Sequence, residues 1–89
     1  MKEVWVLNIR TKKFAHIGYE AYKRKAWAEK RKVEIKQIFP QLVIWVDLHR
    51  QRYFMINKPS AKFGKISIGR KLPYSQIISK LNSENTKAL

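Results

Sequence analysis

The 89-residue chain contains no cysteine, and only six of its residues are Asp or Glu. The absence of cysteine excludes disulfide bonds, thiolate zinc sites, iron–sulfur clusters and thiol nucleophiles. Against the six acids stand twenty Lys and Arg, which leave a formal net charge of +14. Because so strong a charge of one sign repels itself, we expect the protein to bind a polyanionic partner.

The chain also has no long apolar run, since the longest covers only residues 42–46. A membrane-spanning helix needs about 20 apolar residues. The first residues show neither the basic leader nor the apolar core of a signal peptide. We therefore expect a cytoplasmic protein that has no membrane partner.

Hydrophobic residues make up 45% of the chain, which is typical of a globular protein. A chain of 89 residues is long enough for one core and too short for two. We predict a single domain over residues 1–82. Residues 83–89 show no apolar periodicity and are predicted to form a flexible C-terminal tail.

Two segments have the composition or spacing of helices. Residues 19–39 consist mostly of Ala, Lys, Arg, Glu and Gln without internal Gly or Pro, and Pro40 marks the end. In residues 73–81 the apolar positions recur at the spacing of one buried helical face. An alternative interpretation ends the first helix near Arg31 and assigns residues 33–37 to a strand, because Val-Glu-Ile-Lys alternates with period two.

The remaining apolar segments are short, β-branched or aromatic, and typical of strands. Residues 47–50, Asp-Leu-His-Arg, predict a turn between two of these strands, which then form a hairpin. The strands are expected at residues 4–9, 42–46, 52–56 and 65–69, with a short return strand at residues 14–17 as a further option.

The resulting order, β-α-β-β-β-α, predicts an α+β fold in which two helices pack on one face of a small antiparallel sheet. The last five elements follow the order found in double-stranded-RNA-binding domains and in small mRNA-cleaving toxins. The chain contains no sequence motif of either family, so this likeness of element order says little about function.

Basic residues are concentrated in two parts of the chain. Half of them lie between Arg10 and Lys36, including the triplets 23–25 and 30–32, and no acid occurs between Asp47 and Glu84. Neighbouring helix positions are about 100° apart, so each triplet spreads around the helix. A solvated helix face is the alternative to phosphate contact. The residues predicted to contact nucleic acid are Lys23, Arg24, Lys25, Lys30, Arg31, Lys32, Arg50, Arg52, Lys58, Lys62, Lys65, Arg70 and Lys71.

Two aromatic residues lie among these cations, Trp27 in the first helix and Phe63 in a Lys-flanked loop. Exposed rings beside Lys side chains can stack on bases, and packing in the core is the alternative. A broad basic surface suits a duplex, whereas proteins that bind single strands typically use an aromatic groove. The prediction is therefore a non-enzymatic protein that contacts the backbone phosphates of duplex DNA or RNA, with a slight preference for duplexes over single strands.

Two other functions fit the same sequence. A metal-independent, toxin-like ribonuclease would use His49, oriented by Asp47, because positions i and i+2 share one face of a strand. The alternative is that both are ordinary turn residues. A phage or mobile-element inhibitor or adaptor would instead bind an acidic surface, or the nucleic-acid channel, of a larger protein. The scattered acids and unpatterned glycines predict neither a metal site nor a nucleotide cofactor.

Overall fold

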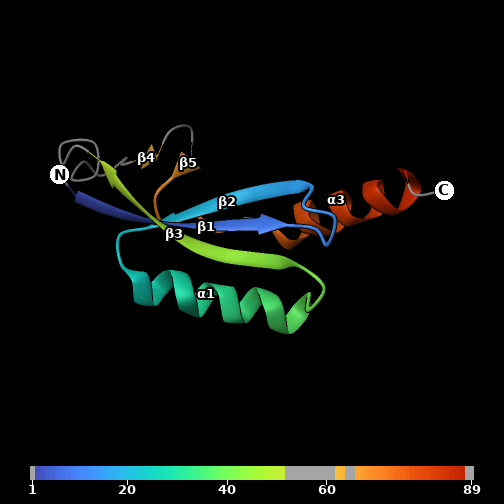
Figure 1. The fold of residues 1–89 in the computed structure, drawn as a ribbon, viewed down its shortest axis with the longest axis horizontal. Coiled ribbons are helices and arrows are strands. Elements are labelled where there is room, and N and C mark those ends of the chain that lie inside the picture. The colour runs from blue at the N-terminus through green and yellow to red at the C-terminus, as the bar shows by residue number, and fades with distance from the viewer. Residues whose placement is uncertain (1, 52–61, 64–65, 88–89) are drawn as a thin grey trace.

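The computed structural model describes residues 2–51, 62–63 and 66–87, and its α+β class is the one predicted. In chain order its elements are β1 (Lys2–Arg10), β2 (His16–Tyr22), α1 (Lys25–Ile38), β3 (Val43–Gln51), β4 (Lys62–Phe63), β5 (Ile66–Ser67) and α3 (Tyr74–Lys87). The larger sheet has the order β2-β1-β3, and β4 and β5 form a separate two-stranded sheet. Figure 1 shows α1 along one side of the larger sheet and the β4–β5 pair on the other side, toward the start of β1.

Strand β1 is central and pairs antiparallel with both neighbours. Leu7 lies opposite Glu20 and Val46, while the next residue, Asn8, lies opposite Tyr19 and Trp45. Directly opposed residues share one face of a sheet, and successive residues alternate between faces. The row of Leu7 therefore lies on the face toward α1, and the row of Asn8 lies on the face away from it.

The main core fills the face toward α1. Leu7 and Ile9 of β1 pack there with Ile35 of α1 and Ile77 of α3, and all four are fully buried. Both helices thus contribute to the same face, as predicted. The opposite face has a smaller cluster at the start of β1, where Ile68 covers Val4, Val6 and Ala21. That face is therefore covered in part, although neither helix packs on it.

Helix α1 begins at Lys25, so the predicted start at residue 19 was wrong. Residues 19–22 belong to β2, which pairs with β1 along its length. Pairing with a neighbouring strand outweighs the weak helix propensity of this segment. The helix ends at Ile38, just before Pro40, as expected, and the alternative strand at residues 33–37 was wrong.

Strand β3 continues through residues 47–50, which were expected to form a turn. The reason is that β1 starts at Lys2 and supplies a partner for each of them, up to the pair of Lys2 with Gln51. The predicted strand at residues 52–56 lies outside the described residues. Helix α3 extends to Lys87, five residues past the predicted domain end at Asn82, because no Gly or Pro interrupts it.

The turn between β1 and β2 is held by side chains as well as backbone. The Thr11 hydroxyl accepts a hydrogen bond from the Ala15 amide, and Arg10 donates one to the Phe14 carbonyl. Phe14 has a φ of 63° and its side chain is 61% exposed. A left-handed conformation costs a residue with a side chain about 1–2 kcal/mol. The return strand expected as an option at residues 14–17 is present as β2, which begins two residues later, at His16, and is longer than predicted.

Residues 69–73, here called the crossover segment, pass around the edge of β2 and connect β5 to α3. The Gly69 amide donates to the Ala21 carbonyl at 2.7 Å, and Leu72 packs against the main core. A Cβ atom at Gly18 would lie 2.9 Å from Leu72, so glycine permits this close approach. Neither of the described helices is long and apolar enough to cross a membrane.

Candidate nucleic-acid interface

A buried ion pair fixes the crossover segment to β2 and α1. The Arg31 Nε atom donates to the Glu20 carboxylate at 2.9 Å, and both side chains are almost fully buried. The Leu72 amide donates to the same carboxylate, while the Leu72 carbonyl and the Tyr74 hydroxyl accept from Arg31. Arg31 is only 4% exposed. The prediction that Arg31 contacts a phosphate is therefore corrected, because its guanidinium already has hydrogen-bond partners inside the protein.

The ionisation of this cluster is shifted by its surroundings. Burial, followed by the hydrogen bond that the Tyr22 hydroxyl donates to Glu20, raises the pKa of Tyr22. Burial lowers the pKa of Arg31, but its bonds to Glu20 and Tyr74 outweigh that effect and leave this pKa raised. The phenol thus stays neutral and the guanidinium stays charged, which preserves the network.

The triplet 30–32 is divided among three directions. Arg31 points inward, and Lys30 and Lys32, two positions apart, lie on opposite sides of α1 because two helix positions span about 200°. Lys30 is exposed and lines a pocket beside the crossover segment. Lys32 is on the same side as Lys25, seven residues earlier, whose ammonium lies 5.6 Å from the centre of the Trp5 ring. Lys30 and Lys32 therefore serve different surfaces.

The triplet 23–25 lies at the start of α1. Arg24 is the N-cap residue of α1, with extended φ and ψ angles of −128° and 137° and no side-chain capping bond. Its guanidinium lies 5.4 Å from the centre of the Trp27 ring. The first turn of α1 contains no acid. The positive end of the helix dipole and these cations therefore add up at one place.

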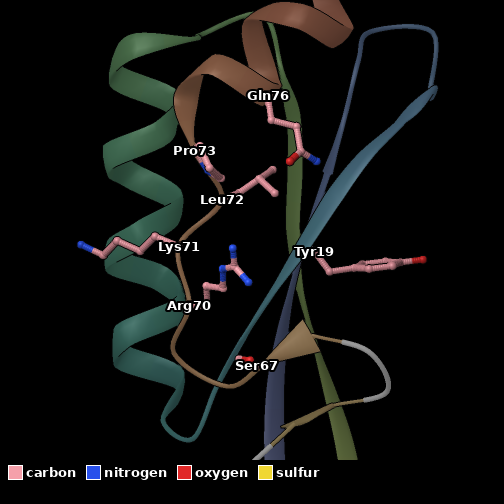
Figure 2. Close-up of a pocket in the computed structure, with 7 residues that line it drawn as sticks. All are labelled: Tyr19, Ser67, Arg70, Lys71, Leu72, Pro73 and Gln76. Carbon is pink, nitrogen blue, oxygen red and sulfur yellow. The ribbon is translucent and has the colours of Figure 1, made fainter.

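Two pockets flank the crossover segment, and Lys71 lines both. One, of about 300 Å³, lies against α1, where Trp27, Lys30 and Glu34 line it. The other, of about 290 Å³, lies at the β2 edge, where Tyr19 and Arg70 line it. In Figure 2 the Lys71 side chain points toward the α1 side and the Tyr19 ring toward the opposite side. We call Arg24, Trp27, Lys30, Arg70 and Lys71 the α1–crossover surface.

Cations outnumber acids at this surface. Glu34 is its acidic neighbour, and one of its carboxylate oxygens lies 3.9 Å from the Lys71 ammonium and 3.4 Å from Arg31. In the described part of the chain, no acid lies within ion-pair distance of Arg24, Lys30 or Arg70. Trp27, predicted as a possible stacking residue, is 53% exposed beside them. The surface thus combines free positive charge with an accessible ring.

The other predicted contacts lie elsewhere or outside the described residues. Lys23 is exposed just before α1, and Arg50 is exposed near the end of β3. Lys62 and Phe63 form β4, and the structure describes only their backbone. The predicted contacts outside the described residues are Arg52, Lys58 and Lys65.

The ribonuclease alternative requires that Asp47 orient His49. Both lie in β3 and on the same face, which is the strand geometry that this alternative required. The Asp47 carboxylate accepts hydrogen bonds from Asn8 at 3.1 Å and from the Trp45 indole at 2.9 Å. These bonds give Asp47 a structural role in orienting the Trp45 ring.

A group of residues that was not predicted from the sequence lies on the sheet face away from α1. It is here called the open-face group and consists of Asn8, Arg10, His16, Tyr19 and Trp45. The His16 and Tyr19 rings have centroids 4.5 Å apart, and the Arg10 guanidinium lies 5.8 Å from the centre of the Trp45 ring. Burial, then Arg10 and Lys80, lower the pKa of His16. The signal that could have found this group is the strand character of residues 16–22, which the helix assignment concealed.

Within the described residues, no three His, Asp or Glu side chains gather as a metal site would require. No protein-family model matches the chain, and comparisons with curated proteins and with solved structures found no match.

Proposed function

We propose that the protein binds nucleic acid by contacting backbone phosphates with its α1–crossover surface. The observation that carries this proposal is that Lys30 of α1 and Lys71 of the crossover segment line one pocket with the exposed Trp27 ring, which Arg24 also contacts. Residue spacing alone does not require such convergence. With the net charge of +14, it favours a polyanion over a solvated helix face.

Phosphate binding also explains a feature of α1 that is unfavourable for folding. Ser, Thr, Asp and Asn are strongly preferred at helix N-caps, whereas α1 has Arg24 at this position. Its free backbone amides and the neighbouring cations form a region of positive potential. A phosphate at this place would accept hydrogen bonds from first-turn amides that have no partner within the helix itself.

The first test is fluorescence anisotropy with labelled duplex DNA, duplex RNA and the corresponding single strands, at several salt concentrations. Each phosphate contact releases condensed counterions, so the logarithm of the affinity should fall linearly with the logarithm of the salt concentration. Weak binding that is equal for all ligands and independent of salt would contradict the proposal. Pull-down after nuclease treatment would then test an acidic protein partner.

Two lysines of the same helix provide a matched test of the surface. We expect Lys30→Glu to weaken binding and to reduce the salt slope by about one or more, as the loss of a phosphate contact should. Lys32→Glu makes the same change of net charge on the other side of α1 and should have a smaller effect. Equal losses in both variants would mean that net charge, and not the α1–crossover surface, determines binding.

Arg24→Asp is expected to stabilise the protein while it weakens binding. The new carboxylate can cap α1 and interact with the helix dipole, which should raise the free energy of unfolding by about 0.5–1.5 kcal/mol after the loss of the Trp27 contact. Urea denaturation and anisotropy measure the two effects. Lys23→Asp makes the same charge change outside the cap position and should stabilise less. A less stable Arg24→Asp variant would contradict the assigned start of α1.

A further inference from the structure

The open-face group places two aromatic rings on neighbouring sides of one polar residue. Asn8 of β1 lies directly opposite Tyr19 of β2 and Trp45 of β3, so the three side chains form one row across the sheet. Tyr19 is 41% exposed, and Trp45 is half-buried with its indole held by Asp47. The rings are thus accessible from solvent and at least one is fixed in orientation.

Positive charge surrounds this row. Arg10 lies over the Trp45 ring and is held in place by its bond to the Phe14 carbonyl. Lys12 and Lys13 are exposed in the adjoining turn, and Lys80 of α3 is near enough to act on His16. A ligand with negative charge would be attracted to this face.

The composition of this face distinguishes between possible ligands. Its apolar part, at the start of β1, is already covered by Ile68. Among the described residues, the exposed remainder consists mainly of rings, amides and cations, together with the Asp47 carboxylate that is bonded to Asn8 and Trp45. Such a polar surface differs from the apolar centre expected of a stable protein interface. Planar rings beside cations match a ligand that has both aromatic faces and phosphates, which is an unpaired stretch of nucleic acid.

We propose that the open-face group stacks on unpaired bases, so that the preferred ligand is nucleic acid with a single-stranded stretch next to its phosphate-bound part. This inference rests on the proposed function and specifies its substrate. The connection is Tyr19, which also lines the pocket formed by Arg70 and Lys71 of the α1–crossover surface (Figure 2). One bound strand can therefore pass from the basic surface around the β2 edge to the rings.

The test compares three labelled ligands: a blunt duplex, the same duplex with a single-stranded overhang, and the overhang strand alone. We expect the wild type to bind the overhang duplex more tightly than the blunt one. Loss of one stacking ring typically weakens binding by roughly 5- to 150-fold. Tyr19→Ala should lose the overhang preference, while Tyr19→Phe, which keeps the ring, should behave as the wild type.

Trp27→Ala is the matched control, because Trp27 is an exposed ring on the other surface. If Trp27→Ala abolishes the overhang preference and Tyr19→Ala does not, the stacking site is not on the open face and the inference is overturned. A wild type that binds blunt and overhang duplexes equally also overturns it, while the proposed function stands. Failure to bind any of the three ligands would instead overturn the proposed function itself.

A second readout does not depend on affinity. The ring protons of His16 can be followed by NMR, since the chain has only two histidines. Addition of the overhang strand should shift the His16 signals, because the ring lies beside Tyr19. Unchanged His16 signals at saturating overhang strand would overturn the inference even if the strand binds elsewhere.

Discussion

Glu20→Gln is expected to lower the free energy of unfolding by about 3–5 kcal/mol, the usual result of removing one partner of a buried ion pair. After the substitution the Arg31 guanidinium remains charged and almost inaccessible to solvent, since Arg31 is only 4% exposed. It also weakens the bond from the Leu72 amide, which helps to fix the crossover segment. Because small domains are stable by about 5–15 kcal/mol, the loss should be plain in urea denaturation.

Glu34→Gln is the control for this variant. Glu34 also contacts Arg31, at 3.4 Å, but its side chain is 37% exposed. Ion pairs in contact with solvent contribute about 0–1 kcal/mol, so this change should be small. If both variants lose the same stability, the Glu20–Arg31 pair is not the buried centre that the structure shows.

Ile77→Ala should produce a loss of similar size, about 2–5 kcal/mol, because the side chain is fully buried and the substitution leaves a cavity. Ile77 is the residue by which α3 enters the main core. Its loss therefore loosens α3 and, through it, the crossover segment with Arg70 and Lys71. Affinity for nucleic acid should fall together with stability.

The neighbouring residue provides the control for Ile77. Ile78 has the same side chain and directly follows Ile77 in the sequence, but it is 47% exposed. Ile78→Ala should change stability by less than about 0.5 kcal/mol, as is usual for surface substitutions. Similar losses in the two variants, measured by urea denaturation, would contradict the packing of α3 on the sheet.

The sequence predicted those elements whose signals are local. Pro40 predicted the end of α1, and the spacing of Ile77 and Leu81 predicted α3, because helix periodicity and proline act within a few residues. The spacing also included Ile78, which the structure leaves exposed. Periodicity predicts a helix more reliably than it predicts which residue of the apolar face is fully buried.

The elements that were wrong depend on partners far away in the sequence. Residues 19–22 have acceptable helix propensity, and only their pairing with β1 makes them a strand. Residues 47–50 resemble a turn and remain extended because β1 begins early enough to pair with them. Contacts of this kind leave little trace in the local pattern.

In the candidate site, too, the sequence predicted what depends on local signals and missed what depends on distant partners. Composition indicated basic residues and Trp27, and exposure of that ring is now established. Composition could not distinguish Arg31 from Lys30 and Lys32, because only the burial of Glu20 determines which of three adjacent cations points inward. The open-face group was missed for a further reason, since its members become neighbours only when β2 pairs with β1.

The crossover segment also has a consequence for biosynthesis. The larger sheet and α1 lie within residues 2–51, and Glu20 can meet Arg31 as soon as this part has been made. Leu72 and Tyr74 join that pair only after the C-terminal third has left the ribosome, since domains fold as their residues emerge. Arg70 and Lys71 arrive at the same time. A nascent chain therefore acquires the second half of its basic surface, and the last bonds of its buried ion pair, in one late step.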